Sequence, residues 1–132
     1  MHSMRSGFTL MELIIAITIM GILVVGGLGT MRYLERARVT KTETELNALK
    51  AVIQDYHAQA GQYPATLEDL VRRPAELSAR KWTKSYDELP RDGWGNEFYY
   101  RLTPGAKHPF ELYSYGSQGE EADKSEWLSV WG

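Results

Sequence analysis

Hydrophobic and polar positions divide the chain into two parts with different patterns. From Leu13 to Met31 no charged residue occurs over a run of 19 positions, whereas the chain beyond is mostly polar. A helix needs about 20 predominantly apolar residues to cross the hydrocarbon core of a bilayer. Residues 8–31 are therefore long enough to form a transmembrane helix, with Glu12 about one turn inside its start.

A helical pattern continues after the apolar run. Apolar residues recur at intervals of three and four positions, at Leu46, Leu49, Ile53, Tyr56 and Ala60. No proline interrupts residues 8–63, and Gly61 followed by Pro64 is typical of a helix end. The sequence therefore predicts one helix of about 50 residues whose second half packs against a small domain.

The last third of the chain predicts antiparallel strands. Residues 97–102 and 110–115 alternate in the way of half-buried strands, and residues 103–105 form a turn signal between them. Asp-Gly and Gly-Asn within residues 92–96 indicate a further turn. The predicted fold class is α+β, with a long N-terminal helix packed on a small domain that contains a short antiparallel β-hairpin.

Between helix and hairpin, the sequence predicts a short helix capped by Thr66 and running to about Arg73, with Asp69 at its third position. Residues 72–86 are basic and irregular, which favours a surface loop. We expect the larger side chains of the hairpin region to pack in the core or on the hairpin: Trp94, Phe98, Tyr100, Phe110, Leu112 and Tyr113.

Composition removes several functions. The net charge is −2, from 15 basic and 17 acidic residues, so no strong basic field favours nucleic acid. The absence of cysteine excludes disulfides and thiolate metal sites. The histidines, His2, His57 and His108, are scattered, and no nucleophile or phosphate-loop motif occurs. A membrane-anchored periplasmic enzyme is the alternative class, and catalytic turnover would reveal it.

The apolar run leaves three points to decide: the type of segment, its orientation in the membrane and the role of Glu12. Its length exceeds the core of about 7–15 residues in a secretory signal peptide, which favours a signal anchor. Arg5 precedes the run and four basic residues follow it by position 41, a count that would place the C-terminal part in the cytoplasm. Glu12 is either an interfacial glutamate or a charge whose partner comes from another chain or a new amino terminus.

The segment Gly7-Phe8-Thr9-Leu10-Met11-Glu12-Leu13 resembles the prepilin cleavage motif of type IV pilins and type II secretion pseudopilins. The resemblance implies that a prepilin peptidase cuts between Gly7 and Phe8 and that the new amine is methylated. It also implies a periplasmic C-terminal domain, against the charge count, and pairing of Glu12 with the Phe8 amine of a neighbouring subunit. Ser6 stands where a basic residue is common in that family.

Four further stretches, residues 61–64, 66–70, 89–96 and 113–123, resemble the major pseudopilins of type II secretion. That likeness implies a subunit of a helical homopolymer, the periplasmic pseudopilus, which drives export of folded proteins. Its implied partners are copies of itself, prepilin peptidase, minor pseudopilins and the inner-membrane secretion platform. A type IV pilin or a minor pseudopilin is the alternative within the same superfamily.

The resemblance divides the chain into a leader (1–7), a transmembrane and filament-core half-helix (8–31) and a periplasmic domain (32–132). Two positions depart from the family, because Gly29 and Gly93 stand where proline is common. The glycines of residues 26–29 either allow close helix packing in lipid or permit unwinding on assembly.

The acidic loop at residues 116–127 is a candidate calcium site. Calcium takes 6–8 oxygen ligands, and the loop carries carboxylates, an amide and glycines. The resemblance implies ligation by Gln118, Glu121 and Asp123 with the carbonyl of Tyr115. Gln118 is neutral where the family is usually charged, and the loop is shorter than in the family. The alternative is an exposed acidic loop without an ion.

Overall fold

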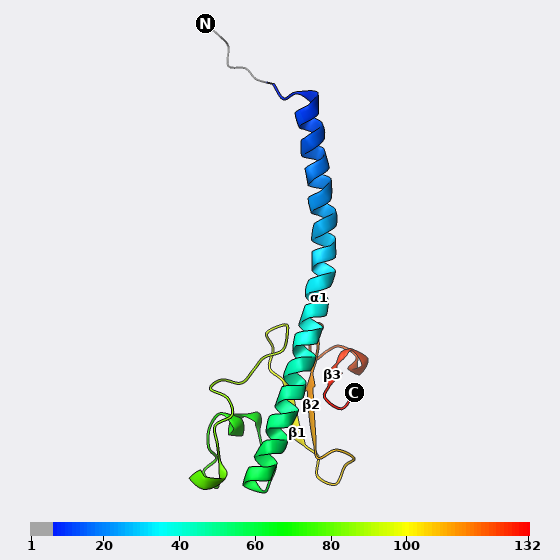
Figure 1. Ribbon diagram of the computed structural model, residues 1–132. Coiled ribbons are helices and arrows are strands. Elements are labelled where there is room, and N and C mark those ends of the chain that lie inside the picture. The colour runs from blue at the N-terminus through cyan, green and yellow to red at the C-terminus, as the bar shows by residue number, and fades with distance from the viewer. Residues whose placement is uncertain (1–6) are drawn as a thin grey trace. The chain divides into compact units, whose positions relative to one another are not determined.

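The computed structural model describes residues 7–132, except for the side chains of residues 25–30. Figure 1 shows its elements in chain order: helix α1 (Leu10–Ala60), the short 3₁₀ turns η1 (Leu67–Leu70) and η2 (Ala79–Lys81), strands β1 (Tyr99–Leu102) and β2 (Phe110–Ser114), turn η3 (Lys124–Glu126) and strand β3 (Leu128–Ser129). The chain divides into two compact units, with the division after Arg36. The α+β class predicted from sequence is confirmed.

Helix α1 contains 51 residues and has defined ends, as predicted. At its start the hydroxyl of Thr9 accepts a hydrogen bond from the Glu12 amide at 3.1 Å, which satisfies an amide that has no partner within the helix. At its end Gly61 adopts a φ of +82°, the left-handed conformation that glycine tolerates, and its amide donates to the carbonyl of His57 at 2.9 Å.

The backbone of α1 is helical through residues 26–29. Whether this stretch unwinds on assembly stays a prediction. Among the described residues, no helix combines the length and apolar content that a membrane crossing requires.

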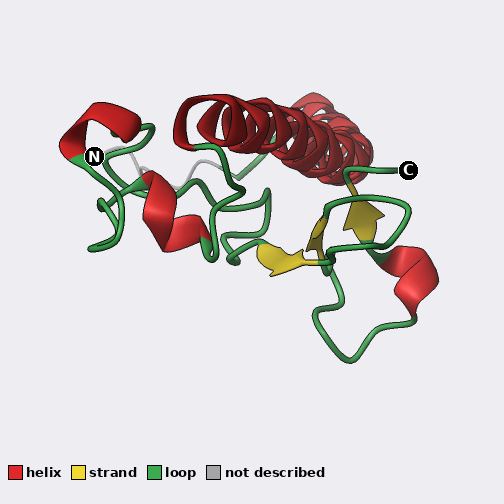
Figure 2. Ribbon diagram, turned by 90° about the horizontal axis from the view of Figure 1, so that it is seen from below, coloured by secondary structure: helices red, strands yellow, loops and turns green. Residues whose placement is uncertain are grey.

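The core of the second unit is built on the predicted stripe of α1. All five stripe residues are buried, and Ile53 at the centre is 0% exposed. Thr42, also 0% exposed, extends the stripe by one turn toward the N-terminus. The other buried hydrophobic residues of this core are Leu70, Leu77, Phe98, Phe110 and Leu112. Figure 2 shows the strands gathered along one side of the helix.

The sheet has the order β1-β2-β3 and is antiparallel throughout. Along β2, Phe110, Leu112 and Ser114 are fully buried, while Glu111 and Tyr113 between them are partly exposed. This alternation follows from the two-residue period of a strand, which gives the sheet an inner face on the core and an outer face toward solvent.

Several strand predictions need correction. Strand β1 begins at Tyr99 rather than at residue 97, and β2 ends at Ser114 rather than at residue 115. The turn between them is longer than predicted, since it closes through a bond from the Thr103 amide to the Pro109 carbonyl at 2.9 Å. Strand β3 was not predicted, because two residues are too short to alternate visibly.

The segment between helix and sheet also differs from prediction. Turn η1 is a 3₁₀ turn that ends at Leu70 rather than a helix to Arg73, and Pro74 disfavours helical geometry at Arg73 directly before it. The Asp69 carboxylate accepts from the Ala65 amide at 2.9 Å, which fixes the turn. The loop beyond is anchored rather than wholly superficial, because the indole of Trp82 donates to the Asp69 carbonyl at 2.7 Å.

Candidate functional site

The predicted processing point lies just outside the helix. Gly7 and Phe8 precede the first helical residue, and Phe8 is 89% exposed. A peptide bond in a non-helical, exposed segment can enter a protease active site without unwinding a helix. The arrangement is therefore compatible with cleavage between these two residues. Residues 1–6 of the predicted leader lie outside the described residues.

Glu12 lies in the first turn of α1. Capping of the helix can explain a glutamate at this position, and the sequence did not predict that role. Thr9 followed three residues later by a glutamate is a capping signature, and the Thr9 hydroxyl does accept from the Glu12 amide. The Glu12 side chain is exposed, and it forms no ion pair among residues 7–132. An acid in the first turn is also favoured by the helix dipole.

The first unit leaves its apolar side chains uncovered. Fifteen of the sixteen large hydrophobic residues that the structure records as exposed fall between Phe8 and Leu34, at 47–89% exposure. Water contact of this extent is unfavourable for apolar side chains, at about 25 cal/mol for each Å². The described surface of this unit therefore requires a lipid or protein environment to cover it.

A buried carboxylate joins two distant parts of the second unit. Asp92 is 1% exposed, and its Oδ1 accepts from the amides of Trp94 at 3.0 Å and Asn96 at 2.8 Å. Its Oδ2 accepts from the Ser114 hydroxyl at 2.7 Å. The same hydroxyl accepts from the Gly116 amide at 3.1 Å. Sequence reasoning missed this network, because an Asp-Gly pair indicates an exposed turn.

The next residue, Gly93, lies directly against α1. Its amide donates to the hydroxyl of Thr42 at 2.9 Å, and that hydroxyl donates to the Arg38 carbonyl at 2.7 Å. A Cβ at Gly93 would stand 2.3 Å from the Arg38 carbonyl oxygen, far inside van der Waals contact. Only glycine fits between this turn and the helix.

The acidic loop is closed by its own contacts. Gly116 at its start has a φ of +80° and lies so close to the Glu126 carbonyl that a Cβ would stand 2.7 Å from it. Within the loop the Ala122 amide donates to the Gly119 carbonyl at 3.1 Å. The Asp123 carboxylate accepts from the Ser125 amide at 3.3 Å and so caps η3.

The predicted calcium ligands differ in exposure. Gln118, Glu121 and Asp123 are exposed, and Tyr115 is half-buried. In the described part of the chain, no group of three or more acidic or histidine side chains could hold a metal ion. The oxygen donors suit calcium, but their convergence is not seen, so the calcium site stays a prediction.

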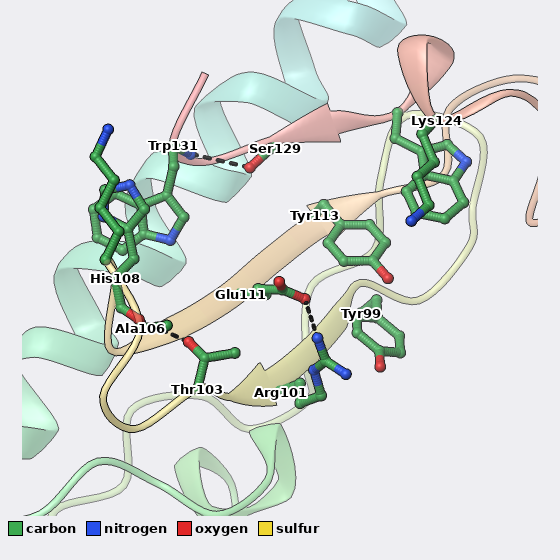
Figure 3. Close-up of a pocket in the computed structure, with 12 residues that line it drawn as sticks. Tyr99, Arg101, Thr103, Ala106, His108, Glu111, Tyr113, Lys124, Ser129 and Trp131 are labelled. Carbon is green, nitrogen blue, oxygen red and sulfur yellow. Dashed lines mark hydrogen bonds and ion pairs between the residues drawn. The ribbon is translucent and has the colours of Figure 1, made fainter.

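A groove of about 560 Å³ lies on the outer face of the sheet. Figure 3 shows its aromatic end, where Tyr99 and Tyr113 stand side by side. The Tyr113 ring stacks on Tyr99 at 4.6 Å and on Trp127 at 4.9 Å. Burial, and then a hydrogen bond with Tyr115, raise the pKa of the Tyr113 hydroxyl above its ordinary value. The rings cover one another's faces, so this cluster stabilises the sheet.

The middle of this outer groove is polar, and its far end is again aromatic. Arg101 and Glu111 form an ion pair at 3.0 Å on its floor (Figure 3). His108 stacks on Trp131 at 4.1 Å, and the Lys50 ammonium lies 4.3 Å from the same indole. Each of these side chains contacts another side chain of the protein. Packing within the protein is therefore sufficient to explain their positions.

A second groove, of about 650 Å³, lies where the end of α1 meets the β1–β2 connection. Its walls are mostly apolar and come from Tyr63, Ala65, Leu102, Pro104 and Pro109. His57 stacks on Tyr63 at 4.1 Å in its wall, which gives this histidine a packing role. Neither described histidine belongs to a group of three or more histidine or acidic side chains that could hold a metal ion.

Comparison with known families and proteins gives a consistent result. A family model described as "Type II secretion system (T2SS), protein G" matches residues 29–130. A second model, described as "Prokaryotic N-terminal methylation motif", matches residues 2–28. Together the two models account for nearly the whole chain.

Individual relatives agree. The type II secretion system core protein G of Pseudomonas aeruginosa is 37% identical over 124 residues, which cover 89% of this chain and 87% of that protein. The core protein G of Vibrio cholerae is 34% identical over 126 residues, which cover 89% of this chain and 84% of that protein. The major pseudopilin from the type 2 secretion system of enterohaemorrhagic Escherichia coli has a TM-score of 0.61 at 24% identity, over 76% of this chain and 92% of that one, which shows a shared fold.

Proposed function

The chain belongs to the type II secretion system protein G family, and we propose that it is a major pseudopilin, the subunit of a periplasmic pseudopilus. The observation that carries the proposal is the joint match of the protein G model and the N-terminal methylation motif along one chain. Its work is mechanical: copies add to a helical homopolymer whose growth exports folded proteins across the outer membrane.

Processing precedes assembly. A prepilin peptidase removes residues 1–7, and the amine of Phe8 is then methylated, as the methylation motif over residues 2–28 supports. The exposed, non-helical setting of Gly7 and Phe8 suits this cleavage. The product begins with the positively charged amine of Phe8, next to the first turn of α1.

The new amine needs a counter-ion once water is excluded. Glu12 is the candidate, because its carboxylate is exposed and has no ion pair among the described residues. Opposite charges attract more strongly as the dielectric falls, and an unpaired buried charge is costly. Glu12 of one copy therefore pairs with the Phe8 amine of the next and sets the register of addition.

Before assembly, the segment 8–31 anchors the subunit in the inner membrane, with the domain in the periplasm. The uninterrupted run of uncharged residues from Leu13 to Met31 and the uncovered apolar side chains of the first unit support this placement. In the assembled pseudopilus, the same side chains pack against those of neighbouring copies. Minor pseudopilins and the inner-membrane secretion platform are the expected further partners.

The subunit has no catalysis of its own in this proposal. The described histidines are engaged in ring stacking, and the family name refers to a secretion apparatus rather than to a reaction. A type IV pilin or a minor pseudopilin is the second candidate within the superfamily. The protein G family match over residues 29–130 favours the major pseudopilin.

The test compares Glu12→Ala with Thr9→Ala in cells that carry the secretion apparatus. Mass spectrometry should find both proteins cleaved after Gly7 and methylated on Phe8. Filaments, released by opening the outer membrane and viewed by electron microscopy, should be abolished by Glu12→Ala, because the Phe8 amine loses its partner. They should persist in Thr9→Ala, which removes only a helix cap worth about 1 kcal/mol.

Thr9→Ala is the matched control, since it disturbs the same helical turn and leaves the carboxylate in place. Equal loss of filaments in both variants would mean that helix capping, and not ion pairing, is the role of this turn. An uncleaved wild-type protein would overturn the pseudopilin proposal itself.

A further inference from the structure

The described side chains that line the apolar groove at the end of α1 leave it unfilled. It takes its walls from three separate segments of the second unit, namely the helix end, residues 62–65 and residues 102–109. Leu102 on its wall is 37% exposed, which is unusual for a leucine within a strand that faces a core. The groove therefore presents apolar surface to water in a unit whose core is otherwise closed.

The groove is preformed. The β1–β2 connection is closed by bonds from Thr103, whose amide donates to the Pro109 carbonyl and whose hydroxyl donates to the His108 carbonyl at 2.7 Å. Gly105 turns the connection with a φ of +81°, and the two prolines restrict it further. A rigid groove loses little conformational entropy when a partner enters.

A matching convex surface exists on α1 itself. Met31 and Leu34 are 68% and 47% exposed, and with the exposed Glu35 they occupy positions i, i+3 and i+4, so they share one helical face. Leu34 and Glu35 lie beyond residue 31, the last residue of the predicted membrane segment. This face therefore combines apolar side chains with one carboxylate in a region that lipid is not expected to cover.

Charge complements shape. Lys107 is exposed and belongs to the lining of the apolar groove. Among residues 7–132, neither Lys107 nor Glu35 takes part in an ion pair. An apolar groove with one cation and a helix face with one carboxylate form a complementary pair, and the charges would fix the register of the contact.

We propose that the apolar groove of one subunit binds the Met31–Leu34–Glu35 face of α1 from a second copy, with Lys107 paired to Glu35. The proposal rests on the proposed function, since it names a contact between copies within the filament. Burial of Met31 and Leu34 supplies the attraction, because removing apolar surface from water is favourable. The ion pair selects which turn of the helix enters.

Cysteine cross-linking tests the contact directly, because the chain contains no cysteine. The full-length double variant Leu34→Cys/Ala106→Cys is expressed with the secretion apparatus and oxidised after filaments are released by opening the outer membrane. We expect disulfide-linked dimers and a ladder of higher multimers on a non-reducing gel. The matched control Ala48→Cys/Ala106→Cys moves the helical cysteine from position 34 to an exposed alanine of α1 and should give no ladder.

Charge reversal gives a second test that does not depend on cysteine. Lys107→Glu and Glu35→Lys should each reduce the yield of filaments released from the periplasm roughly fivefold, and the double variant should restore it to within about twofold. Both positions are exposed, so neither change disturbs the core of a unit.

The outcomes are separable. Filaments that form without the Leu34–Ala106 ladder, or a disulfide confined to single chains, would overturn the contact and leave the pseudopilin proposal standing. Charge reversals that fail to rescue each other would overturn the pairing of Lys107 with Glu35. Absence of filaments from the unmodified protein would overturn the proposed function and this contact together.

Discussion

The two units of the chain handle apolar surface in opposite ways. In the second unit, from Ala37 onward, apolar residues of the helix stripe meet Phe110 and Leu112 in a core at 0–8% exposure. In the first unit, up to Arg36, the large apolar side chains that the structure describes from Phe8 to Leu34 are 47–89% exposed. Apolar side chains are thus buried within the chain in the second unit and exposed in the first.

The difference separates two sources of stability. The second unit has its own core and its own hydrogen-bond network, so its free energy of unfolding is a property of one molecule. In the proposed function, the stability of the first unit depends instead on its surroundings, either lipid or neighbouring copies. Substitutions in the second unit should therefore change melting, whereas substitutions in the first should change insertion or assembly.

The largest expected effect that would test this division is on Asp92. Asp92→Ala removes the acceptor of two amides and of the buried Ser114 hydroxyl, and we expect a loss of about 3 kcal/mol in the free energy of unfolding. Urea denaturation of a fragment spanning residues 32–132 measures it. The control Asp87→Ala removes a carboxylate that is 96% exposed and should cost less than about 0.5 kcal/mol.

A loss for Asp92→Ala as small as that for Asp87→Ala would mean that the buried network does not hold the second unit together. The source of its stability would then lie in the apolar core alone.

Calcium would sharpen the comparison by asking whether the second unit is complete by itself. If the acidic loop binds the ion, a hundredfold excess over the Kd should stabilise the unit by about 2.7 kcal/mol, seen as a higher Tm with calcium than with chelator. Glu121→Gln should reduce the shift, because a carboxylate ligand is lost. No shift in the unmodified protein would mean that the loop depends on its own contacts.

The smallest expected effect concerns alkaline pH. Burial, followed by the charge of Asp69, raises the pKa of the Tyr100 hydroxyl, which donates to the Pro64 carbonyl at 2.6 Å. In the unfolded chain this hydroxyl ionises near its ordinary pKa of about 10, so the folded state holds the proton longer and stability falls as pH rises above about 10.

Tyr100→Phe removes this hydroxyl, so its decline in stability between about pH 10 and pH 11 should be shallower than that of the unmodified protein. The variant should also lose about 1 kcal/mol at neutral pH with the hydrogen bond. Urea midpoints measured across this range would show it. Parallel declines in the two proteins would assign the alkaline loss to other groups.

Local periodicity explains what the sequence predicted well. The stripe from Leu46 to Ala60 and the stop at Gly61 follow from helical spacing and glycine conformation, which act within a few residues. Thr42 was missed because a threonine does not count as apolar, although it is buried against Gly93. Strand β3 was missed because its pairing with β2 is decided by tertiary contacts.

The candidate sites were predicted unevenly for the same reason. Gly7, Phe8 and Glu12 lie within one stretch of seven residues, so a resemblance could indicate them, and their roles stay predictions. Buried Asp92 accepts a hydrogen bond from Ser114, 22 residues away, and no local pattern in the sequence predicts this contact. The apolar groove joins three separate segments, so it exists only after the chain has folded.

The contact of Gly93 with α1 limits which residues can stand at this position. The resemblance places a proline at this position in many family members, but proline has no amide hydrogen to donate to Thr42, and its Cβ would overlap the Arg38 carbonyl. Gly93→Pro would therefore force the turn away from the helix. At this site a substitution that copies the residue common in the family would destabilise this chain.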